Sequence, residues 1–98
     1  MTASQFRVSA KAKRDLLGIG RHTEMKWGRR QRNTYLRQLD QAFQSLAENP
    51  EIGNGCDHIL EGYRKLQQGS HVIYYKAGEV IEIIRVLHYR MDPDSRLP

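Results

Sequence analysis

The side chains best suited to chemistry lie near the end of the chain: Arg85, His88, Tyr89 and Arg90. A guanidinium can hold an anion such as a phosphate, and an imidazole or a phenol can transfer a proton. All four residues follow or interrupt the apolar, β-branched run EVIEIIRVLHY, which predicts a strand over residues 79–89. The cluster is therefore a candidate anion-binding or target-binding site at the end of a strand.

Arg85 and His88 also have purely structural interpretations. Strict alternation along the strand places Arg85 in an apolar row with Ile81, Ile83 and Leu87. The opposite row then holds Val80, Glu82, Ile84, Val86 and His88. An unpaired guanidinium in an apolar row is costly, so we expect Arg85 to pair with Glu61, Glu82 or a backbone carbonyl unless it meets an anion on a concave sheet face. His88 is equally compatible with a hydrogen-bonded histidine at a strand end.

The remaining nucleophilic and metal-binding residue types form no recognisable set. The histidines are scattered over positions 22, 58, 71 and 88, and no His, Cys, Asp or Glu group has the spacing of a metal site. Cys56 is the only cysteine, so an intramolecular disulfide is impossible, and no cationic residue adjoins it in sequence. We therefore predict no catalytic residue, no metal, no cofactor and no small-molecule substrate.

Charge is distributed unevenly along the 98 residues, whose formal net charge is +5. Residues 1–37 carry a net charge of +8, residues 38–63 contain five acids and no Lys or Arg, and residues 64–98 carry +2. A basic chain favours acidic partners, such as nucleic acid or an acidic protein. No apolar run is long enough for a signal peptide or a membrane span, so we expect a cytoplasmic protein without a membrane partner.

Hydrophobic periodicity predicts the elements that position these residues. QFRVS (5–9) alternates like a short strand, and Ser9 is a candidate N-cap for a helix ending at Trp27-Gly28. A second amphipathic stripe predicts a helix over residues 29–48, ended by Asn49-Pro50. A loop over residues 48–62 follows, then strands over 62–67, 71–76 and 79–89 joined by short turns, and an ordered coil over 90–98.

The predicted order is therefore β-α-α-β-β-β, an α+β fold in which an antiparallel sheet packs against a two-helix hairpin. We expect residues 1–98 to form a single domain, with residues 90–98 as its tail. Trp27 lies at the predicted hairpin tip beside Arg29 and Arg30. Trp27 is expected to be part of the core, but together with these two arginines it is also an alternative surface for binding a target.

Four segments in order are similar to ParE toxins of the RelE/ParE superfamily: FRVSAKAKRDLLGI, the turn WG, GYRKLQQGSHVIYYK and VIEIIRVLHYRMDPDSRL. The resemblance covers nearly the whole chain and implies the fold derived above. It also implies a toxin that inhibits DNA gyrase and is neutralised by a ParD-like antitoxin with a ribbon-helix-helix domain, through which alone operator DNA would be bound. The target-binding residues would then be Arg85, His88, Tyr89, Arg90 and Met91.

Two other functions remain open. The first is a ribosome-dependent mRNA endonuclease of the RelE type, for which Arg64, Arg85, His88 and Tyr89 would supply the cationic and proton-transferring groups. The absence of Lys and Arg from residues 38–63 argues against it, because RelE-like nucleases draw lysines from the region before the sheet. The second is a DNA-binding module that uses the basic residues of 1–37, although no helix-turn-helix pattern supports it.

Overall fold

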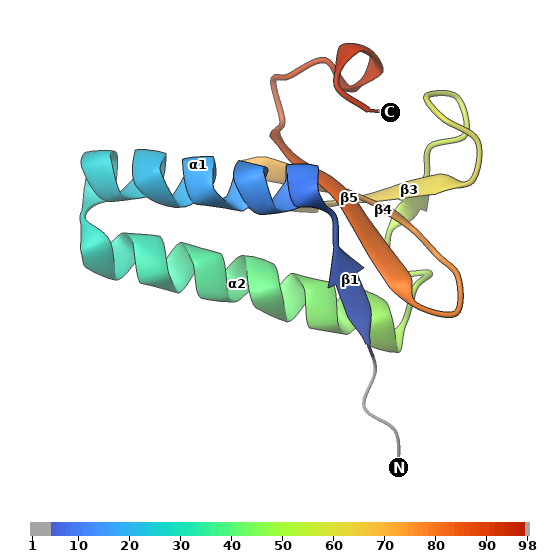
Figure 1. Ribbon diagram of the computed structural model, residues 1–98, viewed down its shortest axis with the longest axis horizontal. Helices are drawn as coiled ribbons and strands as arrows, with labels where there is room; N and C mark the ends of the chain where they lie inside the picture. Colours follow the sequence, from blue (N-terminus) through green and yellow to red (C-terminus); the bar gives the residue numbers. More distant parts are fainter. Residues whose placement is uncertain (1–4, 98) are drawn as a thin grey trace.

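A helical hairpin covers one face of a sheet in the computed structural model, which describes residues 5–97 (Figure 1). Within this range the elements are, in chain order, β1 (Phe6–Val8), α1 (Ala10–Trp27), α2 (Arg29–Glu48), β2 (Asn54–Gly55), β3 (Tyr63–Gln68), β4 (His71–Lys76), β5 (Ile81–His88) and a 3-10 helix, η1 (Pro93–Ser95). The α+β prediction is confirmed, and each predicted helix and strand is present within two residues of its expected ends.

The two ends of α1 are set by a capping side chain and by a glycine. Ser9 caps α1, since its hydroxyl accepts a hydrogen bond from the Ala12 N–H at 3.0 Å and donates one to the Ile84 carbonyl at 2.7 Å. Gly28 ends α1 with a φ of 93°, a conformation that side-chain-bearing residues rarely adopt. A single residue thus reverses the chain, and α2 returns along α1 (Figure 1).

Glycine also explains how closely the two helices pack. A Cβ atom on Gly20 would lie 3.2 Å from Leu36 Cδ1, so this buried glycine of α1 makes room for a side chain of α2. A glycine within a helix often marks a close approach of a neighbouring backbone, but the atoms nearest to Gly20 belong to side chains. Gly18, by contrast, has open space around it and is not required by packing.

Within residues 5–97 the sheet has five strands in the order β1-β5-β4-β3-β2. Two features differ from the predicted antiparallel sheet: β1 pairs with β5 in parallel, and part of the predicted 48–62 loop forms the short strand β2, antiparallel to β3. β5 is apolar on both faces, so it is most stable in the interior of the sheet. The N-terminal strand therefore pairs with its otherwise open edge.

A β-bulge in β5 breaks the alternation that the sequence predicts. Tyr75 pairs with Ile83 and Tyr74 pairs with Arg85, which leaves Ile84 as an extra residue. Beyond this point the faces are exchanged: Val86 packs in the helix-side core with Ile81 and Ile83, and Leu87 packs in a separate cluster. The predicted two-row arrangement is therefore wrong after Ile83.

The separate cluster is a small second core. Its buried residues are Cys56, Tyr74 and Leu87, and Leu97 from the tail packs against them. The tail follows an ordered path, as predicted, and its turn at Asp92-Pro93 begins η1, where the Asp92 carboxylate accepts a hydrogen bond from the Asp94 N–H at 3.0 Å. Pro98, the last residue of the predicted tail, lies outside the described residues.

Candidate functional site

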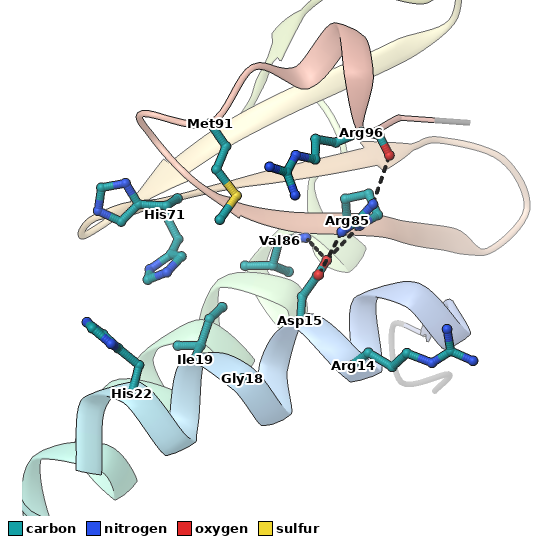
Figure 2. A pocket seen from close by; sticks show the side chains of 11 residues that line it. Arg14, Asp15, Gly18, Ile19, His22, His71, Arg85, Val86, Met91 and Arg96 are labelled. Carbon is teal, nitrogen blue, oxygen red and sulfur yellow. Dashed lines mark hydrogen bonds and ion pairs between the residues drawn. The ribbon is translucent and has the colours of Figure 1, made fainter. Parts of the chain in front are cut away.

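An open groove runs between α1, the end of β5 and the tail. Its first part is a cavity of about 400 Å³ bordered by α1, Arg85, His88, Met91 and Arg96 (Figure 2). Its second part, of about 390 Å³, continues toward the hairpin tip and reaches Trp27. Both parts are lined by the same three histidines, His22, His71 and His88. We call the two parts together the α1–sheet groove.

One side of the groove is held by a paired arginine. Arg85 donates to both carboxylate oxygens of Asp15 on α1, with Nε–Oδ2 at 2.8 Å and Nη2–Oδ1 at 2.9 Å. Its third nitrogen, Nη1, donates to the Arg96 carbonyl of the tail at 2.8 Å (Figure 2). The Asp15 hydrogen bond raises the pKa of Arg85. The expected pairing with a backbone carbonyl is confirmed, but the carboxylate is Asp15, and neither Glu61 nor Glu82 pairs with Arg85.

The bulge explains why Asp15 is needed at this point. The backbone N–H of Val86 donates to Asp15 Oδ2 at 3.0 Å. A bulge disrupts the hydrogen-bond ladder locally, and a buried N–H without a partner is costly. Asp15 therefore satisfies one backbone group and one guanidinium together. The side chains of Arg85 and Asp15 are only 15% and 13% exposed, so the pair is largely shielded from water.

The middle of the groove is formed by histidines in contact with Tyr35. The Tyr35 hydroxyl lies 2.6 Å from His71 Nδ1 and accepts a hydrogen bond from the Ser70 N–H at 3.1 Å. The ring centroids of His71 and His88 are 5.5 Å apart. Burial, together with the nearby His88 and His22, lowers the pKa of His71 to about 4. Its imidazole is therefore neutral at physiological pH and is a weak base.

An exposed aromatic and cationic surface lies where β5 ends. The rings of His88 and Tyr89 stack at 4.7 Å with an angle of 31° between their planes. The Arg90 guanidinium lies 5.4 Å from the Tyr89 ring centroid, and its Nε donates to the Tyr89 hydroxyl at 3.0 Å. Tyr89 is 49% exposed and Met91 41% exposed. Tyrosine, arginine and methionine are common in protein interfaces, so this composition suits contact with a partner.

Trp27 is exposed, so its predicted place in the core is wrong. The indole is 67% exposed, and Trp27 is the last residue of α1, where the hairpin projects beyond the sheet (Figure 1). Arg29 and Arg30 beside it are exposed as well. Trp27 borders the second part of the α1–sheet groove, while His88 and Met91 border the first. Trp27 and Met91, one residue from each predicted target surface, thus lie at opposite ends of the groove, while Arg29 and Arg30 are not among its lining residues.

The four residues considered for a nuclease do not assemble. Arg85 and His88 line the groove, but Arg64 lies on β3, where its Nη2 donates to the Gly53 carbonyl at 2.5 Å. Arg64 thus holds the loop before β3 and contributes no side chain to the groove lining. Among residues 5–97, no group of three or more His, Cys, Asp or Glu side chains is placed to hold a metal ion.

Several residues that shape the groove were not singled out by sequence: Asp15, His22 and Tyr35. Asp15 has a weak signal, since it is the only acidic residue among the first 23. A lone carboxylate in a basic helix must have a cationic or N–H partner to be stable when partly buried. His22 and Tyr35 have no such signal, because their positions depend on how the hairpin packs on the sheet.

The fold is that of chains in two solved toxin–antitoxin complexes. One belongs to the chromosomal ParDE system of P. aeruginosa, with a TM-score of 0.74, 19% identity, and coverage of 88% of this chain and 96% of that one. The other belongs to the RelBE2 complex of Mycobacterium tuberculosis, with a TM-score of 0.66, 21% identity, and coverage of 93% and 97%. Two helices on a mostly antiparallel five-stranded sheet thus give the described residues a RelE/ParE-type fold.

Sequence comparison narrows this class to a family. The sequence model of the ParE toxin of the type II toxin–antitoxin system parDE matches residues 6–93. The chain is 44% identical to toxin ParE1 of Mycobacterium tuberculosis over 97 residues, which span 97% of this chain and 99% of that one. It is 39% identical to toxin ParE1 of Caulobacter vibrioides over 92 residues, spanning 94% and 96%. The protein therefore belongs to the ParE family of type II toxins, and the resemblance stated above is confirmed.

No α-helix of the described chain combines the length and the apolar character that crossing a bilayer requires.

Proposed function

We propose that this ParE-family toxin arrests growth by binding DNA gyrase in the cytoplasm, and that a ParD-like ribbon-helix-helix antitoxin neutralises it. Membership of the ParE family is the observation that carries the proposal. The ParDE complex whose fold it shares supports an antitoxin of the ParD type. In this proposal residues 1–98 act as one toxin domain, and operator DNA is recognised only through the antitoxin.

The chemistry of the groove supports action by binding. Cleavage of RNA needs a group that removes the 2′-hydroxyl proton and a free cation beside the scissile phosphate. Arg85 already pairs with the Asp15 carboxylate and donates to the Arg96 carbonyl, so its guanidinium is not a free cation. His71, with a pKa of about 4, is too weak a base to take up a proton at neutral pH.

We place the gyrase-binding surface at the end of β5, on His88, Tyr89, Arg90 and Met91. Tyr89 and Arg90 restrain each other through a hydrogen bond and a cation–π contact. A side chain that is restrained before binding loses less entropy when a partner is bound. Arg85 contributes indirectly in this scheme: by holding the Arg96 carbonyl it fixes the tail that follows Met91.

We place the antitoxin in the α1–sheet groove. The first part of the groove is mainly apolar, with Ile19, Val86 and Met91 among its lining residues, and Arg14 and Arg96 border it. Such a surface fits an antitoxin segment with apolar anchors and acidic flanks. Because Met91 belongs to both surfaces, a bound antitoxin would also cover part of the gyrase-binding surface, and this overlap would explain neutralisation.

Two activity measurements test the proposal. In a gyrase supercoiling assay we expect Tyr89→Ala combined with Met91→Ala to weaken inhibition at least tenfold. A control variant changes Leu17 and Ile52 to alanine, because these apolar side chains are also exposed, at 67% and 45%, but lie outside the groove lining. Equal inhibition by both variants would remove the β5 end as the target surface.

The second measurement separates gyrase inhibition from the RelE-type alternative. In a translation reaction with ribosomes, we expect message to stay intact at toxin concentrations that inhibit gyrase fully. Cleavage of message within codons, with gyrase unaffected, would establish the endonuclease function instead. Arg85, His88 and Tyr89 would then be the first residues to substitute.

A further inference from the structure

The outer face of α2 carries a second concave surface that is separate from the α1–sheet groove. It encloses about 450 Å³ and is lined by Arg29, Arg30, Asn33, Thr34 and Arg37. Positions 30, 33, 34 and 37 share one face of the helix. The opposite face is the buried one, which includes Leu39 and Leu46. We call these five lining residues the α2 basic surface.

The cations of this surface form no ion pair within the described residues. Within residues 5–97 the ion pairs are Arg32–Glu24 and Arg85–Asp15, so Arg29, Arg30 and Arg37 are each without an ionic partner. Near the start of α2, Glu24 pairs with Arg32 and not with an arginine of this surface. Three unpaired guanidiniums on one concave surface create a local positive potential that favours a polyanion.

We propose that the α2 basic surface binds the phosphate backbone of duplex DNA. Arginine suits phosphate because its planar donors can pair with two phosphate oxygens, and the Asn33 amide and Thr34 hydroxyl supply hydrogen-bond donors between the arginines. Seven residues separate Arg30 from Arg37, a rise of about 10.5 Å along a helix. This rise is comparable to the ~12 Å width of the major groove, so a duplex could place phosphates of its two strands against the two arginines.

The position of the surface on the molecule leaves it accessible. The hairpin projects beyond the sheet, so its outer face can approach a duplex without contact from the strands or the tail (Figure 1). Contacts to phosphate carry no sequence information. The binding is therefore non-specific, distinct from operator recognition by an antitoxin, and independent of whether gyrase is the target.

The test is a titration of the full-length toxin against a labelled duplex of arbitrary sequence, followed by fluorescence anisotropy at several salt concentrations. Each neutralised phosphate contributes about 0.9 to the slope of log affinity against log salt. Changing Arg29, Arg30 and Arg37 to glutamine should therefore make this slope shallower by about 2.7. Changing the same residues to lysine should restore most of the slope, since lysine keeps the charge.

A matched control variant has the same net charge as the α2 glutamine variant. Lys11, Lys13 and Arg21 are exposed residues of α1, and changing them to glutamine also removes three positive charges. Circular dichroism must first show that all variants are folded. An equal loss of slope in the control and the α2 variant would show general attraction without a site and overturn the proposal. Tighter binding of polyglutamate than of duplex DNA, lost in the α2 variant alone, would overturn it in favour of an acidic protein partner.

Discussion

Removing the Asp15 carboxylate should destabilise the protein, because this one side chain accepts hydrogen bonds from both the Arg85 guanidinium and the Val86 N–H. Asp15→Ala leaves the Val86 N–H and the Nε and Nη2 donors of Arg85 without their acceptor, in a region where both side chains of the pair are at most 15% exposed. Breaking a buried ion pair by removing one partner costs about 3–5 kcal/mol. Because some water reaches this pair, we expect a loss near the lower limit, about 3 kcal/mol in the free energy of unfolding.

Urea unfolding followed by circular dichroism measures this loss. Asp40→Ala is the control, because Asp40 is exposed and its carboxylate accepts a hydrogen bond from Gln44 on the same helix, at 2.7 Å, so its removal should change stability by less than about 0.5 kcal/mol. In a double-mutant cycle with Arg85→Met, the two changes should be less costly together than their sum by about 1–3 kcal/mol. A loss for Asp15→Ala within 0.5 kcal/mol of the control would refute the role that we assign to this carboxylate.

Three further predictions concern other parts of the chain. The pKa of His71 falls from 6.5 to about 4 on folding, so the folded state binds fewer protons than the unfolded state between these pH values. The free energy of unfolding should therefore fall by about 1–2 kcal/mol as the pH is lowered across this interval. A His71→Gln variant with the same pH profile in chemical denaturation would contradict this. Truncation after Tyr89 removes Leu97 from the second core and the Arg96 carbonyl from Arg85, so the midpoint of thermal unfolding should fall by several degrees, and an unchanged midpoint would show that the tail does not stabilise the fold. Trp27→Ala should change stability by less than about 0.5 kcal/mol in urea, because the indole is exposed, whereas a loss above 2 kcal/mol would mean that it is packed.

Local signals in the sequence were sufficient for the elements of the fold. Ser9 and Gly28 mark the two ends of α1 through capping chemistry that depends only on neighbouring residues. The strand order was not accessible in the same way. β1 and β5 are more than 70 residues apart, and no local pattern specifies that they pair in parallel. The bulge at Ile84 was also missed, because it depends on register with β4 rather than on the composition of β5.

The candidate site was predicted only in part for the same reason. The run from His88 to Met91 was identified because its side chains are contiguous in sequence. The groove beside it is assembled from α1, β4, β5 and the tail, and residues such as His22 and His71 come together only when the hairpin packs on the sheet. Arg85 illustrates the limit: its need for a partner followed from burial, but the partner, Asp15, lies 70 residues away.

The most direct test of the central claim is a titration of purified gyrase with the purified toxin, followed as supercoiling of relaxed plasmid DNA. Action by binding predicts inhibition that saturates with toxin concentration and is reversed when the ParD-like antitoxin is added, with gyrase recovering full activity. Supercoiling that is unaffected by saturating toxin would contradict the account. So would inhibition at toxin levels far below those of gyrase that persists after the antitoxin is added, because this would indicate a catalytic modification.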